Sequence, residues 1–202
     1  MQLSTRDEKP SAGHVLLAYA ANNPRMPHFP EGMLCLGGAL RDAGMEARLL
    51  DAALVPEKDW DFEGAAILAM SVYTNESIRI ALKLARKFRK LYPDKKIVWG
   101  GPHCHLAQEE TAEHPLVDAV CFGEGEGAIV ALAKQASQDE WSPELVPGIL
   151  YKEDERILRT EAPRPLKAAE FPWPDYELLD LDRYGFASRK LYYQSSRGCP
   201  AL

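Results

Sequence analysis

Two short stretches of the sequence combine residue types suited to holding a ligand. In SVYTNE (residues 71–76), small and hydroxyl side chains let a large ligand approach the backbone and accept hydrogen bonds, but a helix cap at Thr74 or Asn75 is the favoured explanation of this stretch alone. In WGGPH (residues 99–103), two glycines indicate backbone that passes close to another group or takes a positive φ, and a tight turn is the alternative. Taken singly, neither stretch identifies a ligand.

A third stretch, FGEGEG (residues 122–127), looks like a glycine-rich loop entering a helix. Backbone N–H groups and the helix dipole favour an anion at such a loop, but Glu124 and Glu126 would repel a phosphate. The dinucleotide fingerprint places its glycines after the opening strand, where this sequence has AANNPRMPHFP. The pattern therefore argues against an NAD-type site. The lack of an Asp at the end of the third expected strand argues against a phosphorelay receiver.

Potential metal ligands are concentrated in residues 103–114, which contain His103, Cys104, His105 and His114. Three adjacent ligands cannot easily share one tetrahedral centre, and zinc sites use wider spacing, so we expect no metal there. The four cysteines of the chain have irregular spacing and predict no disulfide framework. This favours a reduced, cytoplasmic protein.

The elements that must position these stretches alternate between strand and helix over the first 140 residues. The expected strands cover residues 14–20, 46–52, 65–73, 95–101 and 117–123. The clearest helix follows residue 75, with apolar side chains at three- and four-residue spacing, and Gly44 is placed to end the first helix. Such alternation predicts an α/β domain with a doubly wound, five-stranded parallel sheet of the Rossmann-like or flavodoxin-like kind. Ligands of these sheets lie at the carboxyl ends of the strands, where all three stretches fall.

Two adjacent glycines, Gly37 and Gly38, lie inside the first expected helix. Each lowers helix stability by about 1 kcal/mol relative to alanine, so we expect close packing there, against the sheet or against a ligand, with close packing alone as the simpler alternative. Cys35 and Cys121 are interpreted as small apolar residues of a helix and a strand.

The pattern changes after residue 140. Residues 148–161 predict a hairpin that turns near Asp154. Four prolines follow within residues 163–174, and they predict an extended segment anchored by Phe171, Trp173 and Tyr176. The expected divisions are a disordered N-terminus (1–12), an α/β domain (13–140), a hairpin extension (141–162), a proline-rich linker (163–189) and the first strand of a further domain (190–202).

Composition excludes several classes of protein. Of 202 residues, 46% are hydrophobic and 27% are charged, with a net charge of -6, as in ordinary soluble domains. The sequence contains no basic stripe interleaved with aromatic residues, so it does not predict nucleic-acid binding. The apolar runs are too short for a membrane span, and the polar N-terminus lacks the apolar stretch of a signal peptide.

Several motifs occur here in the order typical of one family: GALRDAG, EARLLDA, SVYTNE, IVWGGPH, LVDAVCFGEGE, GILYK, PWPDYELLD and YYQSSRGCP. Over residues 14–200 the chain resembles the N-terminal cobalamin-binding domain of cobalamin-dependent (class B) radical SAM enzymes, followed by the linker into their barrel. The resemblance implies that a corrinoid lies over the strand ends. The residues it implies as cofactor contacts are Asn22, Ser71, Val72, Tyr73, Thr74, Asn75, Gly100, Gly101, Pro102, His103, Gly123, Glu124, Gly125 and Glu126.

One departure from classical cobalamin domains concerns the lower axial ligand. Their Asp-x-His-x-x-Gly signature is missing after the first strand, because residues 22–28 contain no such spacing. The resemblance then implies cobalamin bound base-off, without a histidine ligand.

The cluster motif of the family is Cys-x3-Cys-x2-Cys, which holds a 4Fe–4S cluster whose open iron binds S-adenosylmethionine. Cys199 matches the first of these cysteines, and the second would follow directly after Leu202. One thiolate cannot hold the cluster. We therefore expect the front part of a longer, methyltransferase-like enzyme whose radical SAM barrel is missing, with no catalytic residue in this chain.

Two other functions remain open from the residues. One is a self-sufficient α/β enzyme using a nucleotide or flavin, although no nucleophile–base set or carboxylate pair is evident. The other is a free-standing corrinoid carrier or sensor, in which the last 40 residues would fold back as a cap.

Overall fold

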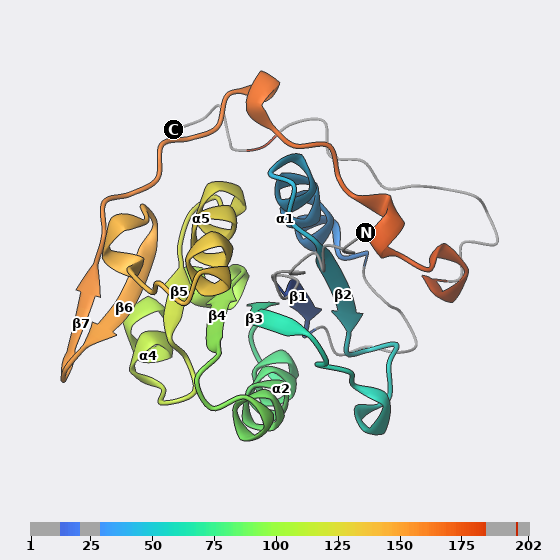
Figure 1. The fold of residues 1–202 in the computed structure, drawn as a ribbon, viewed down its shortest axis with the longest axis horizontal. Coiled ribbons are helices and arrows are strands. Elements are labelled where there is room, and N and C mark those ends of the chain that lie inside the picture. Colours follow the sequence, from blue (N-terminus) through green and yellow to red (C-terminus); the bar gives the residue numbers. More distant parts are fainter. Residues whose placement is uncertain (1–12, 21–28, 185–196, 198–202) are drawn as a thin grey trace, which may run out of the picture.

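The computed structural model describes residues 13–20, 29–184 and 197 (Figure 1). The expected disordered N-terminus (1–12), Asn22 and Cys199 lie outside these residues, as does the expected final strand from residue 190.

The sheet has seven strands in the order β2-β1-β3-β4-β5-β6-β7. Their bounds are β1 His14–Tyr19, β2 Ala47–Asp51, β3 Ala65–Ser71, β4 Lys96–Gly100, β5 Ala119–Cys121, β6 Ile149–Glu153 and β7 Arg156–Arg159. The first five strands pair in parallel in the flavodoxin-like order, which confirms the predicted α/β class. The predicted count of five is too low, because the hairpin β6–β7 turns at Asp154 and continues the sheet antiparallel to β5. The hairpin thereby covers an edge that would otherwise be unpaired.

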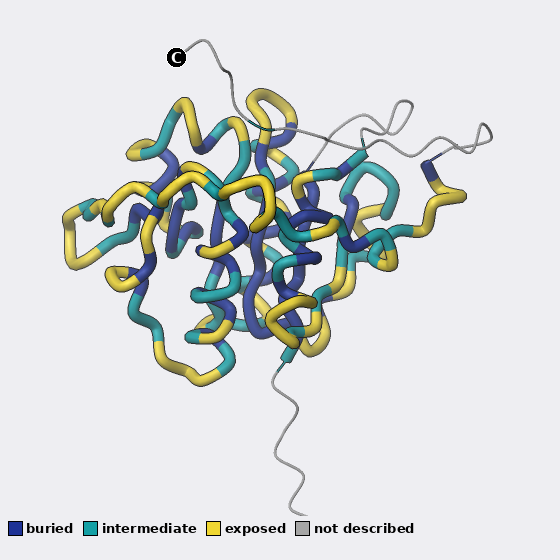
Figure 2. The backbone as a smooth tube through the Cα atoms, turned by 90° about the horizontal axis from the view of Figure 1, so that it is seen from above, coloured by how far each residue is buried: buried dark blue, intermediate teal, exposed yellow. Residues whose placement is uncertain are grey.

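Helices cover both faces of the parallel strands (Figure 1). Helices α1 (Glu31–Asp42) and α5 (Glu126–Ser137) lie on one face, and α2 (Glu76–Leu91), α3 (Pro102–Leu106) and α4 (Gln108–Glu113) lie on the other. Side chains alternate between the faces, so that in β3 Leu68 and Met70 join the α2 layer while Ile67 and Ala69 join the α1–α5 layer. Seen from above, buried residues occupy the centre and exposed residues the rim (Figure 2). Within the described ranges, no helix is long and apolar enough to cross a membrane.

Short 3-10 turns occupy the connections and the segment after the hairpin: η1 Glu57–Asp59, η2 Pro143–Leu145, η3 Ala168–Glu170, η4 Tyr176–Leu178 and η5 Leu181–Tyr184. The predicted extended segment is therefore interrupted by turns.

The start of α2 differs from the predicted side-chain cap. Asn75 occupies the N-cap position with φ of 69°, and its side chain makes no capping hydrogen bond. Instead, the Ser77 hydroxyl accepts a hydrogen bond from the Tyr73 N–H at 2.9 Å. Asn tolerates the left-handed region better than most residues, which explains its presence at this sharp change of direction.

The segment after β7 crosses the upper side of the domain from the hairpin to α1 (Figure 1). A Cβ on Gly38 would lie 2.0 Å from the Trp173 carbonyl oxygen, and one on Gly37 would lie 2.3 Å from the Leu178 side chain. The glycine pair is therefore closely packed, as expected, and its packing partner is this segment rather than the sheet. The Asp175 N–H also donates to the Leu34 carbonyl of α1 at 2.9 Å.

The three expected aromatic anchors behave differently. The Tyr176 ring lies 6.1 Å from that of Phe29, and Phe171 lies under the Arg197 guanidinium at 4.8 Å. Trp173 is 70% exposed, and its carbonyl oxygen accepts a hydrogen bond from Arg41 of α1 at 3.2 Å.

Candidate cofactor site

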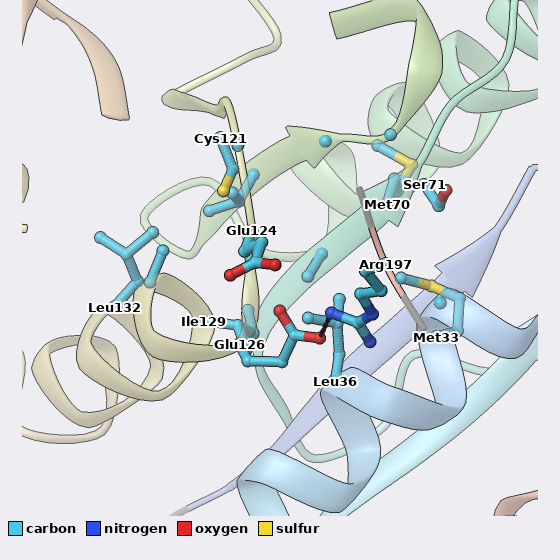
Figure 3. Close-up of a pocket in the computed structure, with 18 residues that line it drawn as sticks. Met33, Leu36, Met70, Ser71, Cys121, Glu124, Glu126, Ile129, Leu132 and Arg197 are labelled. Atoms are coloured by element: carbon cyan, nitrogen blue, oxygen red, sulfur yellow. Dashed lines mark hydrogen bonds and ion pairs between the residues drawn. The ribbon is translucent and has the colours of Figure 1, made fainter. Parts of the chain in front are cut away.

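A cavity of about 310 Å³ opens where β3, β4 and β5 end, between the sheet and the helices α1 and α5 (Figure 3). Its position agrees with the rule that open α/β sheets bind ligands outside the carboxyl ends of their strands. The lining residues are Gly32, Met33, Leu36, Ala69, Met70, Ser71, Val98, Gly100, Gly101, Cys121, Gly123, Glu124, Gly125, Glu126, Ala128, Ile129, Leu132 and Arg197.

Glycines bring the backbone of the strand ends close together at the cavity. Gly101 has φ of +90°, and a Cβ there would lie 2.7 Å from the Ser71 hydroxyl and 2.9 Å from the Val72 nitrogen. Gly100 has room for a Cβ, 3.7 Å from that of Cys121, so its lack of a side chain leaves space in the cavity. The two glycines of WGGPH thus have different roles: Gly101 makes the turn, and Gly100 keeps the wall flat.

The remaining wall is apolar and rich in sulfur. Met33, Ile129 and Leu132 contribute aliphatic and thioether surface. Burial raises the pKa of the Cys121 thiol to about 12, so this side chain is neutral at physiological pH. Such a lining suits a flat, weakly polar ring rather than a free anion.

The two carboxylates of FGEGEG bind later parts of the chain. Glu124 Oε2 accepts a hydrogen bond from the Leu166 N–H at 2.7 Å. Glu126 is buried at the start of α5 and forms an ion pair with Arg197 (Figure 3). The repulsion that these carboxylates would exert on a phosphate is therefore reduced by partners within the chain.

The structure brings together only part of the predicted contact set. Seven of the predicted residues line the cavity: Ser71, Gly100, Gly101, Gly123, Glu124, Gly125 and Glu126. Val72 is fully buried in the α2 layer, Thr74 and Asn75 are exposed, and Pro102 begins α3. Tyr73 is 43% exposed and stands edge-on to Tyr19, with 6.0 Å between ring centroids.

His103 lies behind the turn that ends β4. Its N–H donates to the Val72 carbonyl at 3.0 Å, and its Nε2 lies 3.3 Å from the Thr111 hydroxyl. Its Nδ1 is buried without a hydrogen-bond partner among the described residues. His114 is engaged elsewhere, accepting the Leu116 N–H at 3.2 Å, and no group of three or more His, Cys, Asp or Glu side chains in the described part could hold a metal ion.

The helix residues of the cavity were not predicted as site residues. Gly32, Met33 and Leu36 of α1 and Ala128, Ile129 and Leu132 of α5 have the same apolar character as core residues. Nothing in their spacing separates a cavity wall from a core. Arg197, in the SSRGCP motif that also contains Cys199, is likewise a cavity residue outside the predicted set.

The carboxyl ends of β1 and β2 form a second polar cluster, which is closed. The Tyr184 hydroxyl donates to Asp51 Oδ2 at 2.7 Å, and Asp51 Oδ1 accepts from the Ala53 N–H at 2.8 Å. Burial raises the pKa of Asp51 and of Tyr184 above their usual values. The cluster attaches η5 to the end of β2.

Comparison with known proteins agrees with this architecture. Residues 19–133 match the model of the B12 binding domain. The anaerobic magnesium-protoporphyrin IX monomethyl ester cyclase of Synechocystis sp. is 30% identical over 196 residues, covering 92% of this chain and 39% of the relative. The cobalamin-dependent radical SAM methyltransferase TokK of Streptomyces tokunonensis is 30% identical over 142 residues, covering 66% and 21%.

A solved structure shares the fold. The cobalamin-dependent S-adenosylmethionine radical enzyme OxsB, with aqua-cobalamin and S-adenosylmethionine bound, matches with a TM-score of 0.70 at 19% identity, covering 86% of this chain and 25% of that one. The chain spans about two fifths of the cyclase and less of the other proteins. Because the family model matches more than half of its residues, the chain belongs to the B12-binding domain family.

Proposed function

We propose that this chain binds cobalamin, with the nucleotide tail of the corrinoid in the cavity between the strand ends and the helices α1 and α5. The observation that carries the proposal is an apolar, glycine-walled cavity at the carboxyl ends of β3, β4 and β5 in a member of the B12-binding family. Its 310 Å³ falls within the volume of about 300–1,000 Å³ that is usual for small-molecule sites.

The residues present fit such a group. The thioether and aliphatic wall would exclude water from a heteroaromatic base, while the Ser71 hydroxyl offers one polar contact beside it. Just after the turn that ends β4, the Nδ1 of His103 is a buried polar atom without a hydrogen-bond partner among the described residues. The chemistry that a corrinoid supplies when bound is the carriage of a methyl group on cobalt. The chain's own part is to hold the tail, so that the cofactor is kept base-off without a histidine ligand.

A wider assignment proposes for this chain the kind of enzyme that its relatives are named as. We assign the chain to a cytoplasmic, methyltransferase-like radical SAM enzyme, in which Cys199 is the first ligand of a 4Fe–4S cluster that binds S-adenosylmethionine. Its partner is then the radical SAM barrel of that enzyme, and the chain alone is expected to be inactive. The support is similarity to the cyclase and to TokK, together with the SSRGCP motif.

The test is retention of the cofactor. The chain is incubated with hydroxocobalamin, desalted and examined by visible spectroscopy, and retained corrinoid with a base-off spectrum is expected. Gly100→Leu, which places a side chain into the cavity, should lower retention at least about tenfold.

The matched control is Gly127→Leu, an exposed position where a Cβ meets no atom within 4 Å. It should retain as much corrinoid as the unaltered chain. Equal retention in Gly100→Leu would show that the corrinoid does not use this cavity, and no retention by any variant would contradict the proposal for this chain.

A further inference from the structure

We propose that Glu124 and Glu126 attach the C-terminal part of the chain to the rim of the cavity, with Arg197 as the residue that positions the segment containing Cys199. This inference depends on the proposed function only for the identity of the ligand in the cavity. It concerns the chain's own contacts, which exist with or without a cofactor.

Arg197 joins three parts of the molecule. Its guanidinium forms an ion pair with Glu126 at the start of α5, and the two side chains are only 22% and 7% exposed. Its charge also lies near the Cys35 thiol of α1, and the guanidinium lies over the Phe171 ring at 4.8 Å. Figure 3 shows the guanidinium between α1 and α5, directed at the Glu126 carboxylate. A charge held among a carboxylate, a thiol and an aromatic face is fixed in position far more firmly than a surface arginine.

Glu124 makes the companion contact with the linker. Its carboxylate accepts the Leu166 N–H at 2.7 Å, and a Cβ on the neighbouring Gly123 would lie 2.8 Å from the Pro163 ring. The loop therefore binds chain that lies 42 residues later through Glu124 and 71 residues later through Glu126. Neither carboxylate is needed to form the loop, because the backbone turns at Gly123 with φ of +79°.

The ion pair connects the cavity with the segment after it. Arg197 and Glu126 both line the cavity, so an occupant of that space touches the pair.

The test is hydrogen–deuterium exchange of the full 202-residue chain without corrinoid. In Arg197→Ala and in Glu126→Gln, amides of residues 190–202 should exchange at least about tenfold faster than in the unaltered chain. The double variant should exchange no faster than the faster single variant, because one contact is lost in all three. Arg197→Lys, which keeps the charge, should lie between the unaltered chain and Arg197→Ala.

Two further variants separate this contact from general destabilisation. Glu124→Ala should raise exchange in residues 163–170 but leave residues 190–202 unchanged. Arg48→Ala removes an exposed arginine, 54% accessible, at the other end of the sheet and should change neither region. Exchange of the β1–β5 amides reports any general loss of stability. If Glu126→Gln raises the exchange rate of those amides, the test rests on Arg197→Ala and Arg197→Lys instead.

The proposal is overturned if residues 190–202 exchange at the unprotected rate in the unaltered chain, or if Arg197→Ala leaves their exchange unchanged. Cobalamin retention by the unaltered chain, measured on the same samples, tests the proposed function separately. Faster exchange in the variants, without cobalamin retention by the unaltered chain, would support this inference and contradict the proposed function. Cobalamin retention with no change of exchange in the variants would support the proposed function and contradict this inference.

Discussion

The carboxyl edge of this sheet has two ends, one closed by large side chains and the other containing a cavity. At the ends of β1 and β2, the edge is closed by the Tyr184–Asp51 hydrogen bond and by the edge-on ring pair of Tyr19 and Tyr73. At the ends of β3, β4 and β5, glycines and a small alanine leave a cavity of about 310 Å³. The first end holds the chain's own η5 turn, and the second end has space for a ligand.

This difference shows where the fold can hold a ligand. Large side chains close an edge by filling it, so the closed end gains stability from burial and from a buried phenol–carboxylate hydrogen bond. The open end gives up that burial and relies on backbone contacts around Gly101 to stay in place. Substitutions should therefore affect the two ends by different physical routes.

The largest effect is expected at the open end, from Gly101→Ala. The residue would be held at φ of +90° with its Cβ 2.7 Å from the Ser71 hydroxyl and 2.9 Å from the Val72 nitrogen. We expect the free energy of unfolding to fall by about 2–4 kcal/mol, measured by urea denaturation. The control is Gly127→Ala in the first turn of α5, which should raise it by up to about 1 kcal/mol. An unchanged stability in Gly101→Ala would mean that the open end does not depend on this close approach.

A smaller effect is expected at the closed end, from Tyr184→Phe. The change leaves the buried Asp51 without its 2.7 Å hydrogen bond, which should lower the free energy of unfolding by about 1–3 kcal/mol. Tyr151→Phe is the matched control on the hairpin and should change it by less than about 0.5 kcal/mol. If both variants unfold at the same urea concentration, the buried hydrogen bond does not stabilise the closed end.

The closed end should also respond to pH in a defined direction. Burial holds the pKa of Asp51 above its unfolded value of 3.8, so the folded chain binds this proton more tightly than the unfolded chain. The contribution of Asp51 is therefore fully present below pH 3.8 and is lost as pH rises through its folded pKa. Asp51→Asn should gain stability relative to the unaltered chain as pH rises through this window. A difference that is constant with pH would contradict the raised pKa.

The sequence predicts the elements far better than it predicts the contacts between distant segments. The buried β3 run and the two-sided α2 pattern each follow from local periodicity, and the hairpin turn follows from Asp154, which takes φ of 55°. Periodicity does not say which edge a hairpin joins, so the addition of β6 to β5 could not be predicted. The five-stranded count was too low for that reason.

The site shows the same limit. Glycines and hydroxyls at strand ends could be predicted as site residues, and Ser71, Gly100 and Gly101 line the cavity. The partners of Glu124 and Glu126 lie 42 and 71 residues away, which no local pattern records. Cavity residues on α1 and α5 are indistinguishable from core residues, because a helix face lining a cavity and a helix face in a core are both apolar.

The smallest effect on stability, and the sharpest test of how the C-terminal chain is attached, is expected from Gly38→Ala. A Cβ at this position would lie 2.0 Å from the Trp173 carbonyl oxygen, while alanine inside α1 favours the helix by up to about 1 kcal/mol. The free energy of unfolding should therefore change by less than about 1 kcal/mol, while residues 172–178 detach from α1. Limited proteolysis should cut this segment faster than in the unaltered chain. Gly32→Ala, in the same helix and with no atom within 4 Å of the added Cβ, should leave the cleavage rate unchanged. Equal cleavage of both variants would show that the linker is held by its polar contacts to α1 alone, and that the glycine pair is not what admits it.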